Sequence, residues 1–150
     1  MDISFDLDST LIPHGNEFES EHRNWLAKLL GIEPIRKDSA LLISALQKQG
    51  HHIHIYTTSF RSTFKIRLLL LYYGIRVEKI INEFQNQRTL KKKTIKSSKY
   101  PPAFGFDLHI DDSKGVGIEG EKFGFKTIII KTIDKNWVET IKKGIEDFKV

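Results

Sequence analysis

Short apolar segments of strand length recur along this 150-residue chain, and segments with helical periodicity lie between them. A strand buried on both faces forms a nearly continuous apolar run, whereas an amphipathic helix repeats its apolar residues every three or four positions. Strands that alternate with helices in this way form βα units with a mostly parallel sheet. The sequence therefore predicts a three-layer α/β/α, Rossmann-like doubly wound fold with five strands, at 2–7, 51–58, 77–81, 106–110 and 126–130.

Four helices are expected around these strands, at 17–30, 39–49, 59–73 and 134–148. The third, which Ser59 or Arg61 would begin, is apolar nearly all round and is therefore expected to be covered on more than one side. Two segments are not expected to be regular: the one around Pro101 and Pro102, and a flexible glycine-rich loop after residue 112. No linker or low-complexity tract divides the chain, so residues 1–150 are expected to form one domain.

Composition narrows the class of protein. The chain has no cysteine, which excludes disulfides and thiolate metal sites. No apolar run approaches the roughly 18 residues of a membrane span, so we expect a cytoplasmic protein without a membrane partner. The net charge of +5 is local, because the stretch from Arg88 to Lys99 holds six basic residues and no acid. This stretch either attracts an anionic substrate or is only a solvated loop, and both interpretations remain open.

Two aspartates, Asp6 and Asp8, follow the first predicted strand in the stretch ISFDLDSTL. Because side chains alternate along a strand, both carboxylates leave its end on the same side. They repel each other unless a cation lies between them or one is protonated. An EF-hand calcium loop is excluded, since it needs Asp or Asn at Thr10 and Gly at Leu11. Taken alone, the pair is also compatible with a simple turn and helix cap.

Further polar side chains follow two other predicted strands. The range 57–59 (TTS) ends the second strand, and Asp111 and Asp112 end the fourth, with Lys99 a short loop upstream. Open α/β sheets bind ligands beyond the carboxyl ends of their strands. These carboxylates, hydroxyls and the lysine are therefore expected to converge on one site.

In order and spacing, these residues resemble the motifs of the haloacid dehalogenase (HAD) superfamily of phosphohydrolases. The first motif, a hydrophobic residue followed by Asp-x-Asp-x-(Thr/Val)-(Leu/Val), is matched by residues 5–11. The second, a strand that ends in Thr or Ser, is matched by 53–57, and the fourth, an acidic pair after a hydrophobic strand, by 108–112. The resemblance implies a HAD-like domain, and the intervals 13–50 and 82–99 leave room for no sizeable cap.

The resemblance also implies a function: magnesium-dependent hydrolysis of a phosphate monoester through an aspartyl-phosphate intermediate. Asp6 would be the nucleophile and Asp8 the general acid and base. Thr57 would donate a hydrogen bond to a phosphoryl oxygen. Mg²⁺ would be held by Asp6, the backbone carbonyl of Asp8 and the acidic pair, with Asp112 in direct contact and Asp111 acting through water or the lysine.

The third motif of the superfamily is a single basic residue. Lys99 is expected to be this catalytic lysine, because the prolines after it leave little room for a helix before the fourth strand, a spacing similar to that of deoxyribonucleotidase members. Lys91, Lys92 and Lys93, about twenty residues before the acidic pair, are the alternative. Further contacts to the substrate are expected from Thr10, Thr58, Ser59 and Arg61.

The substrate would be a phosphorylated molecule, and the basic stretch makes a nucleotide or a nucleic-acid end plausible. A signalling receiver domain is disfavoured, because its phosphorylated aspartate follows the third strand, where this chain has Ile81-Asn82-Glu83. The second alternative is a catalytically silent HAD-fold module that binds nucleic acid or a protein, although the presence of Asp8 weighs against it. Four histidines without metal-ligand spacing are expected to be packing or surface residues: His51, His52, His54 and His109.

Overall fold

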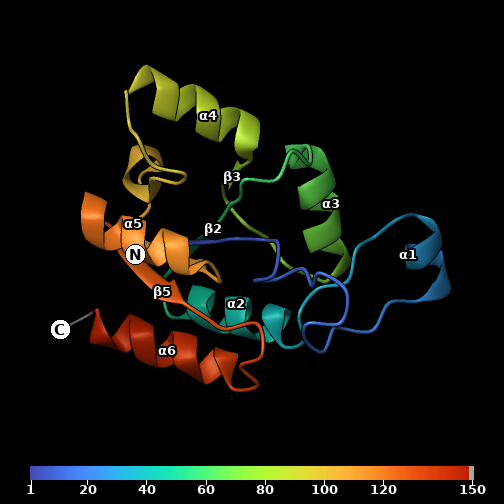
Figure 1. Ribbon diagram of the computed structural model, residues 1–150. Helices are drawn as coiled ribbons and strands as arrows, with labels where there is room; N and C mark the ends of the chain where they lie inside the picture. The colour runs from blue at the N-terminus through green and yellow to red at the C-terminus, as the bar shows by residue number, and fades with distance from the viewer. Residues whose placement is uncertain (149–150) are drawn as a thin grey trace.

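Five parallel strands form the centre of the computed structural model, which describes residues 1–148, in the spatial order β3-β2-β1-β4-β5 (Figure 1). This arrangement confirms the predicted three-layer, Rossmann-like α/β fold, and the sheet is parallel throughout. The strand order reverses between β1 and β4, which is where ligands bind in open α/β sheets. The strands are β1 (Asp2–Phe5), β2 (His52–Tyr56), β3 (Ile80–Ile81), β4 (Leu108–Asp111) and β5 (Lys126–Ile129).

Six α-helices and one short 3₁₀ helix surround the sheet in the described part of the chain. Among residues 1–148, no helix combines the length and the apolar character that crossing a bilayer requires. The helices are α1 (Trp25–Leu29), α2 (Ser39–Lys48), α3 (Thr63–Tyr72), α4 (Glu83–Lys92), η1 (Pro101–Phe104), α5 (Lys114–Phe123) and α6 (Trp137–Asp147).

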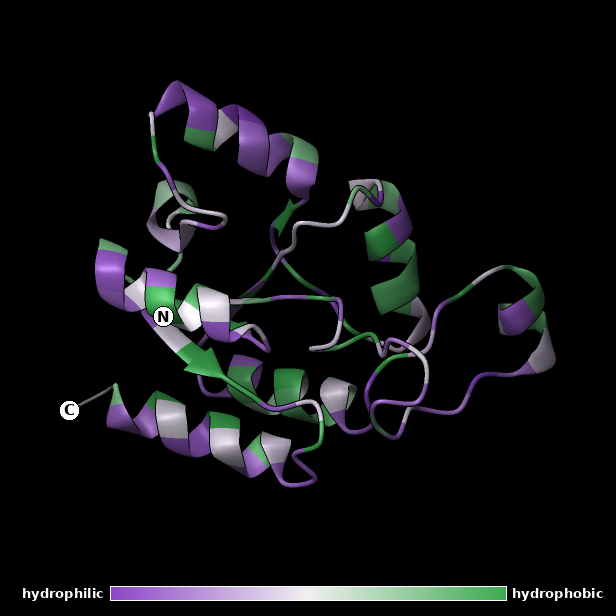
Figure 2. Ribbon diagram, in the orientation of Figure 1, coloured by the Kyte–Doolittle hydropathy of each residue, from purple (hydrophilic) through white to green (hydrophobic). Residues whose placement is uncertain are grey.

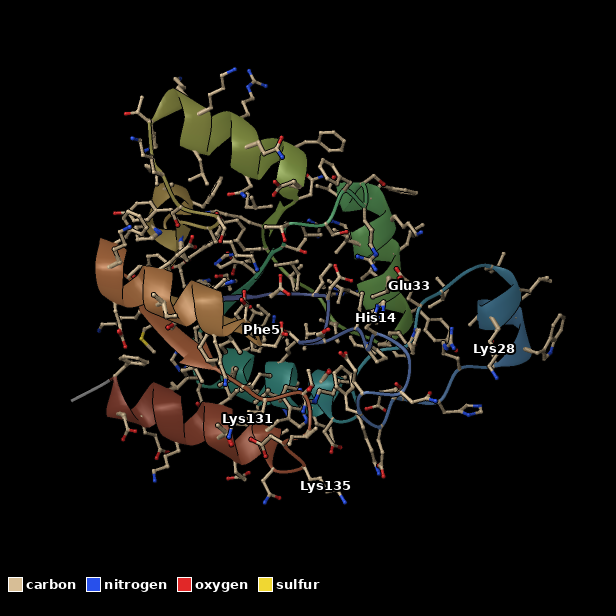
Figure 3. All side chains as sticks on the ribbon, viewed as in Figure 1. Phe5, His14, Lys28, Glu33, Lys131 and Lys135 are labelled. Carbon is tan, nitrogen blue, oxygen red and sulfur yellow. The ribbon has the colours of Figure 1, made fainter. Side chains whose placement is uncertain are left out.

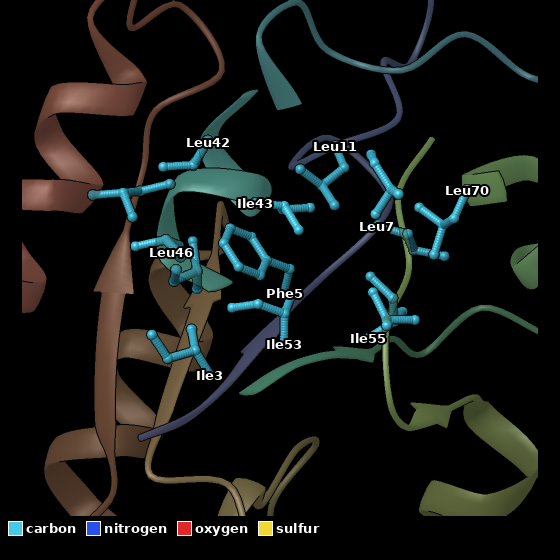
Figure 4. Packing of buried hydrophobic residues seen from close by; sticks show 14 of the residues in the cluster. Ile3, Phe5, Leu7, Leu11, Leu42, Ile43, Leu46, Ile53, Ile55 and Leu70 are labelled. Atoms are coloured by element: carbon cyan, nitrogen blue, oxygen red, sulfur yellow. The ribbon is translucent and has the colours of Figure 1, made fainter. Parts of the chain in front are cut away.

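The two faces of the sheet differ in polarity because side chains alternate along each strand. On β1, Ile3 and Phe5 pack into the hydrophobic core with residues of α2 such as Leu46 (Figure 4). Ser4 and Asp6 leave the opposite face, and both are buried. The apolar face provides most of the core, whereas buried polar groups collect on the face covered by α4, η1 and α5 (Figure 1).

Two helices were not expected from the sequence. The basic stretch was expected to be a loop or patch, but most of it belongs to α4, which begins with a reciprocal capping box between Asn82 and Gln85. The glycine-rich segment was expected to be a flexible loop, but it forms α5. There the glycines permit close packing: a Cβ added to Gly120 would lie 2.8 Å from the backbone oxygen of Phe125. The prolines at 101 and 102 likewise begin η1, where a missing N–H costs nothing.

The predicted helix at 17–30 is mostly wrong. Only Trp25–Leu29 is helical, and it lies within a long excursion, residues 13–38, that extends to one side of the domain (Figure 1). Its helical spacing of apolar residues does not reflect burial, because Ala27 is the only residue of α1 that is buried. The excursion is held near its base by a bridge between Ser20 and Arg36.

Candidate active site

Asp6 and Asp111 lie side by side at the carboxyl edge of the sheet because β1 and β4 pair in register, Phe5 opposite Ile110. Lys99 reaches both carboxylates: its Nζ is 2.5 Å from Oδ1 of Asp6 and 2.6 Å from Oδ2 of Asp111. All three side chains are almost completely buried. The predicted nucleophile, one acid of the pair and the preferred lysine therefore form a single buried network.

The segment that carries Lys99 is held in place by residues from two helices. Glu119 of α5 accepts hydrogen bonds from the Ser98 amide (2.9 Å), the Ser98 hydroxyl (2.6 Å) and the Ser97 hydroxyl (3.1 Å). Asn86 of α4 donates to the backbone oxygen of Ser98 at 2.9 Å. The two unexpected helices thus determine where the lysine lies.

His109 is a member of this network that the sequence interpretation missed. Its Nε2 lies 3.0 Å from Oδ2 of Asp111 and 3.4 Å from Nζ of Lys99, and its Nδ1 lies 2.9 Å from the Ser4 hydroxyl. Burial, together with the Lys99 ammonium, lowers the pKa of His109 to about 4. The ring is therefore neutral at physiological pH. Its position two residues before Asp111, on the same face of β4, was the available indication.

Among residues 1–148, Asp6, Asp111 and Asp112 form an acidic group whose oxygens lie within 4.8 Å of one another. Burial raises the pKa of Asp6 to about 7, and the Asp111 carboxylate adds to this rise while Lys99 opposes it. Burial and Asp111 also raise the pKa of Asp112. One ammonium thus faces three converging carboxylates. Their oxygens are hard donors of the kind that Mg²⁺ prefers.

The two acids of the pair have different surroundings. Asp111 contacts Lys99. Burial alone would raise the pKa of Asp111, but the hydrogen bond with His109 and the charge of Lys99 hold this pKa well below its usual range. Asp112 is half-buried, and its Oδ1 accepts a hydrogen bond from the Thr10 hydroxyl at 3.2 Å. Thr10, which was expected to contact the substrate, is fully buried. Its hydroxyl instead orients Asp112.

Asp8 does not belong to the acidic group, and it is exposed. We call the surface around Asp8 and Arg61 the mouth of the site. A tight turn, in which Ser9 has φ 60°, follows Asp8 directly. Arg61 contacts its carboxylate at 2.9 and 3.0 Å. The same guanidinium forms a bidentate pair with Glu33 of the excursion, with both distances 2.7 Å. The Glu33 hydrogen bonds raise the pKa of Arg61 further. Arg61, expected to meet substrate, thus connects Asp8 to the excursion.

The second-motif residues follow β2 at the same edge. Thr57 is buried, and its hydroxyl accepts a hydrogen bond from the Ser59 amide at 3.1 Å. The Ser59 hydroxyl accepts from Nη1 of Arg61 at 2.7 Å. Thr58 is exposed. Thr57 and Ser59 therefore form one turn beside Asp8.

The alternative lysines, Lys91 to Lys93, lie at the far end of α4. The helix begins beside the site, where the amide of Glu83 donates to the backbone oxygen of Ser59 at 3.0 Å. Its ten residues extend away from that edge over about 14 Å. The exposed basic side chains at its carboxyl end complement the helix dipole there.

A cavity of about 580 Å³ lies on the β5 side of the site, between the excursion and the start of α6. Arg36 forms part of its wall, buried between the rings of Phe18 and Trp137 at 4.3 and 4.8 Å. Nη1 of Arg36 donates to the backbone oxygen of Thr10, so the cavity adjoins the first-motif turn. None of the acidic group lines it.

Comparisons with known proteins assign no family to the chain. Neither a scan against protein-family models nor a search of curated proteins found a match. The interpretation of the site therefore depends on its geometry and on the resemblance of its motifs.

Proposed function

We propose that this protein is a magnesium-dependent phosphatase of the HAD type, which hydrolyses a phosphate monoester through an aspartyl-phosphate on Asp6. The observation that best supports this proposal is the position of the Asp6 carboxylate, which contacts the Lys99 ammonium and lies beside the acidic pair. A lysine that neutralises a nucleophilic carboxylate also attracts the anionic phosphoryl group.

In the first step, a carboxylate oxygen of Asp6 attacks phosphorus and the ester oxygen leaves with a proton from Asp8. In the second step, water attacks phosphorus, Asp8 accepts a proton from it, and inorganic phosphate leaves with the Asp6 carboxylate restored. Asp8 suits this work because it is exposed at the mouth of the site, where Arg61 orients it. Lys99 and the Thr57 hydroxyl would stabilise the transferring phosphoryl group.

Mg²⁺ held by Asp6, the backbone carbonyl of Asp8 and the acidic pair would neutralise the charge of the carboxylates and that of the phosphoryl oxygens. The three aspartates suit this ion because they are oxygen donors and because Lys99 compensates only part of their negative charge. His109 would keep Asp111 directed at Lys99.

The deciding experiment is a panel of phosphate monoesters, including an aryl phosphate, nucleotides and 5′-phosphorylated oligonucleotides, assayed with Mg²⁺ and with EDTA. We expect turnover that needs Mg²⁺, is abolished by Asp6→Asn and is strongly reduced by Asp8→Asn. Asp147→Asn, an exposed carboxylate on α6, is the matched control and should be fully active. Folded wild-type protein without magnesium-dependent turnover on any ester would instead favour the catalytically silent binding module.

A nucleotide or nucleic-acid end remains our proposed substrate class, and a cytoplasmic location remains a prediction from the sequence. The changes Lys91→Ser, Lys92→Ser and Lys93→Ser, made together, test whether the basic stretch takes part. Because these side chains are at the far end of α4, we expect unchanged activity on nucleotides. Reduced activity on oligonucleotides alone would indicate that α4 binds the nucleic-acid chain.

A further inference from the structure

Helix α1 presents large apolar side chains to solvent at the end of the excursion. Trp25, Leu29 and Leu30 are 75%, 74% and 70% exposed, and Leu26 is also exposed. Isolated exposed apolar residues are ordinary, but three in one short helix and a fourth at its C-cap are not. This helix therefore has an apolar surface that the described part of the chain does not cover.

Helix α3 has a second exposed apolar surface. Its buried stripe packs on the core, whereas a second stripe at positions i, i+4, i+7 and i+8 faces solvent: Phe64, Leu68, Leu71 and Tyr72. The sequence predicted that this helix is covered on more than one side, but residues 1–148 cover only one side of it. Figure 2 shows the apolar character of α3 along most of its length. The α3 stripe thus also lacks a partner.

The amino end of α1 meets the carboxyl end of α3. The backbone amide of Asn24, which caps α1, donates to the Tyr72 hydroxyl at 3.2 Å. At the other end of α3, the exposed rings of Phe60 and Phe84 meet edge to face at 5.0 Å beside the candidate site. We call the exposed apolar residues of α1 and α3, together with Phe60 and Phe84, the apolar belt.

The charges on the belt indicate what would cover it. Segments 22–32 and 60–77, which hold every residue of the belt except Phe84, contain no aspartate or glutamate. Lys28 and Lys65 are exposed, and neither forms an ion pair within residues 1–148. Figure 3 shows Lys28 on the outer part of the excursion. A second copy of the chain, docked through the same belt, would bring these cations together, whereas an acidic partner would neutralise them.

We propose that the apolar belt is the docking surface for another protein, which it recognises through an amphipathic, acidic segment. Aromatic anchors such as Trp25 and Phe64 would supply most of the binding energy, as such residues do at the centres of interfaces. The cations would give the complex its selectivity for acidic sequences and its sensitivity to salt. The belt ends at Phe60, between Ser59 and Arg61, so a bound partner would lie next to the mouth of the candidate site.

The test uses the full chain and three synthetic peptides: an amphipathic helix of leucine and glutamate, the same peptide with lysine for glutamate, and a scrambled acidic peptide without an apolar face. Trp25 is the reporter, because the only other tryptophan, Trp137, is already buried. We expect the acidic amphipathic peptide alone to shift the Trp25 emission to shorter wavelength, with binding weakened at least about tenfold in high salt.

Leu29→Ser combined with Leu68→Ser should weaken this binding at least about tenfold. The matched control is Leu41→Ser on α2, because Leu41 is equally exposed (71%) but lies outside the belt. Circular dichroism should show that each variant is folded. Three results would overturn the proposal: equal binding of all peptides, self-association of the chain through the belt measured by sedimentation, or a Trp25 shift produced by phosphatidylcholine and phosphatidylserine vesicles but by no peptide. None of these measurements depends on phosphatase activity.

Discussion

Nζ of Lys99 lies 2.5 Å from Oδ1 of Asp6, although 93 positions separate the two residues in the sequence. The contact lies at the carboxyl ends of β1 and β4, where the strand order reverses. Lys99 also contacts Asp111, the last residue of β4. Burying an ammonium and two carboxylates is costly unless they compensate one another. This network is therefore the feature of the site from which the following predictions start.

Lys99→Met should reduce kcat/KM at least about 100-fold, because the nucleophile and the phosphoryl group lose their nearest cation. Lys92→Met removes an equal charge from the end of α4 and should leave kcat/KM unchanged. Because Lys99→Met also leaves two buried carboxylates unpaired, its fold should be checked by circular dichroism and Lys99→Arg measured beside it. Full activity of Lys99→Met, or loss of activity in Lys92→Met, would move the catalytic lysine to α4.

Glu119→Gln should lower kcat about tenfold with little change in KM, because the Ser97–Ser98 segment would no longer hold the lysine in place. Glu121→Gln, on the exposed side of α5, is the matched control. Steady-state kinetics on the best ester from the panel would measure both effects. If the two variants behave alike, Glu119 does not position Lys99.

Asp6→Asn should change the pH dependence of stability. Burial raises the folded-state pKa of Asp6 from 3.8 to about 7, so between these pH values the folded protein retains a proton that the unfolded chain has released. The contribution of Asp6 to stability is therefore lost as the pH rises from about 4 to about 7. Since asparagine does not ionise, the free energy of unfolding of Asp6→Asn relative to wild type should rise over this range.

Urea denaturation in EDTA at several pH values would measure this difference. Asp147→Asn, at an exposed position, should show no such trend. Added Mg²⁺ should reduce the advantage of Asp6→Asn, because an ion that binds only the folded wild-type protein stabilises it. A difference that does not vary with pH would contradict the raised pKa of Asp6.

Gly120→Ala should destabilise the protein by about 1 to 3 kcal/mol, because the new methyl group would lie 2.8 Å from the backbone oxygen of Phe125 and force α5 away from β5. Gly115→Ala in the same helix meets only the Ser113 hydroxyl, at 3.4 Å, and should be neutral or stabilising by up to about 1 kcal/mol. Thermal or urea denaturation would compare the two. Equal effects would mean that α5 does not pack closely on the sheet.

Much of the fold could be predicted because the strands have a strong local pattern. Apolar runs such as residues 3–7 and 53–56 are buried wherever they pair, and alternation with helices implies parallel order. The helices were harder to predict. The pattern of α1 suggested a buried helix, yet its large apolar residues are exposed. The segment of α4 was interpreted from its basic residues alone, although its capping box marks the start of a helix. Local polarity does not reveal which side a helix presents to a neighbour.

The sequence by itself determined the mostly parallel α/β architecture and the residues that follow its strands, because alternating periodicity and strand-end position are local properties. Only the tertiary structure decided the partners of those residues: Asp6 with Lys99, Asp111 with His109, and Asp8 with Arg61. It also decided that α4 and α5 hold the lysine and that α3 keeps one apolar side exposed. Such contacts depend on how segments far apart in the chain pack together, and no local pattern of residues encodes that packing.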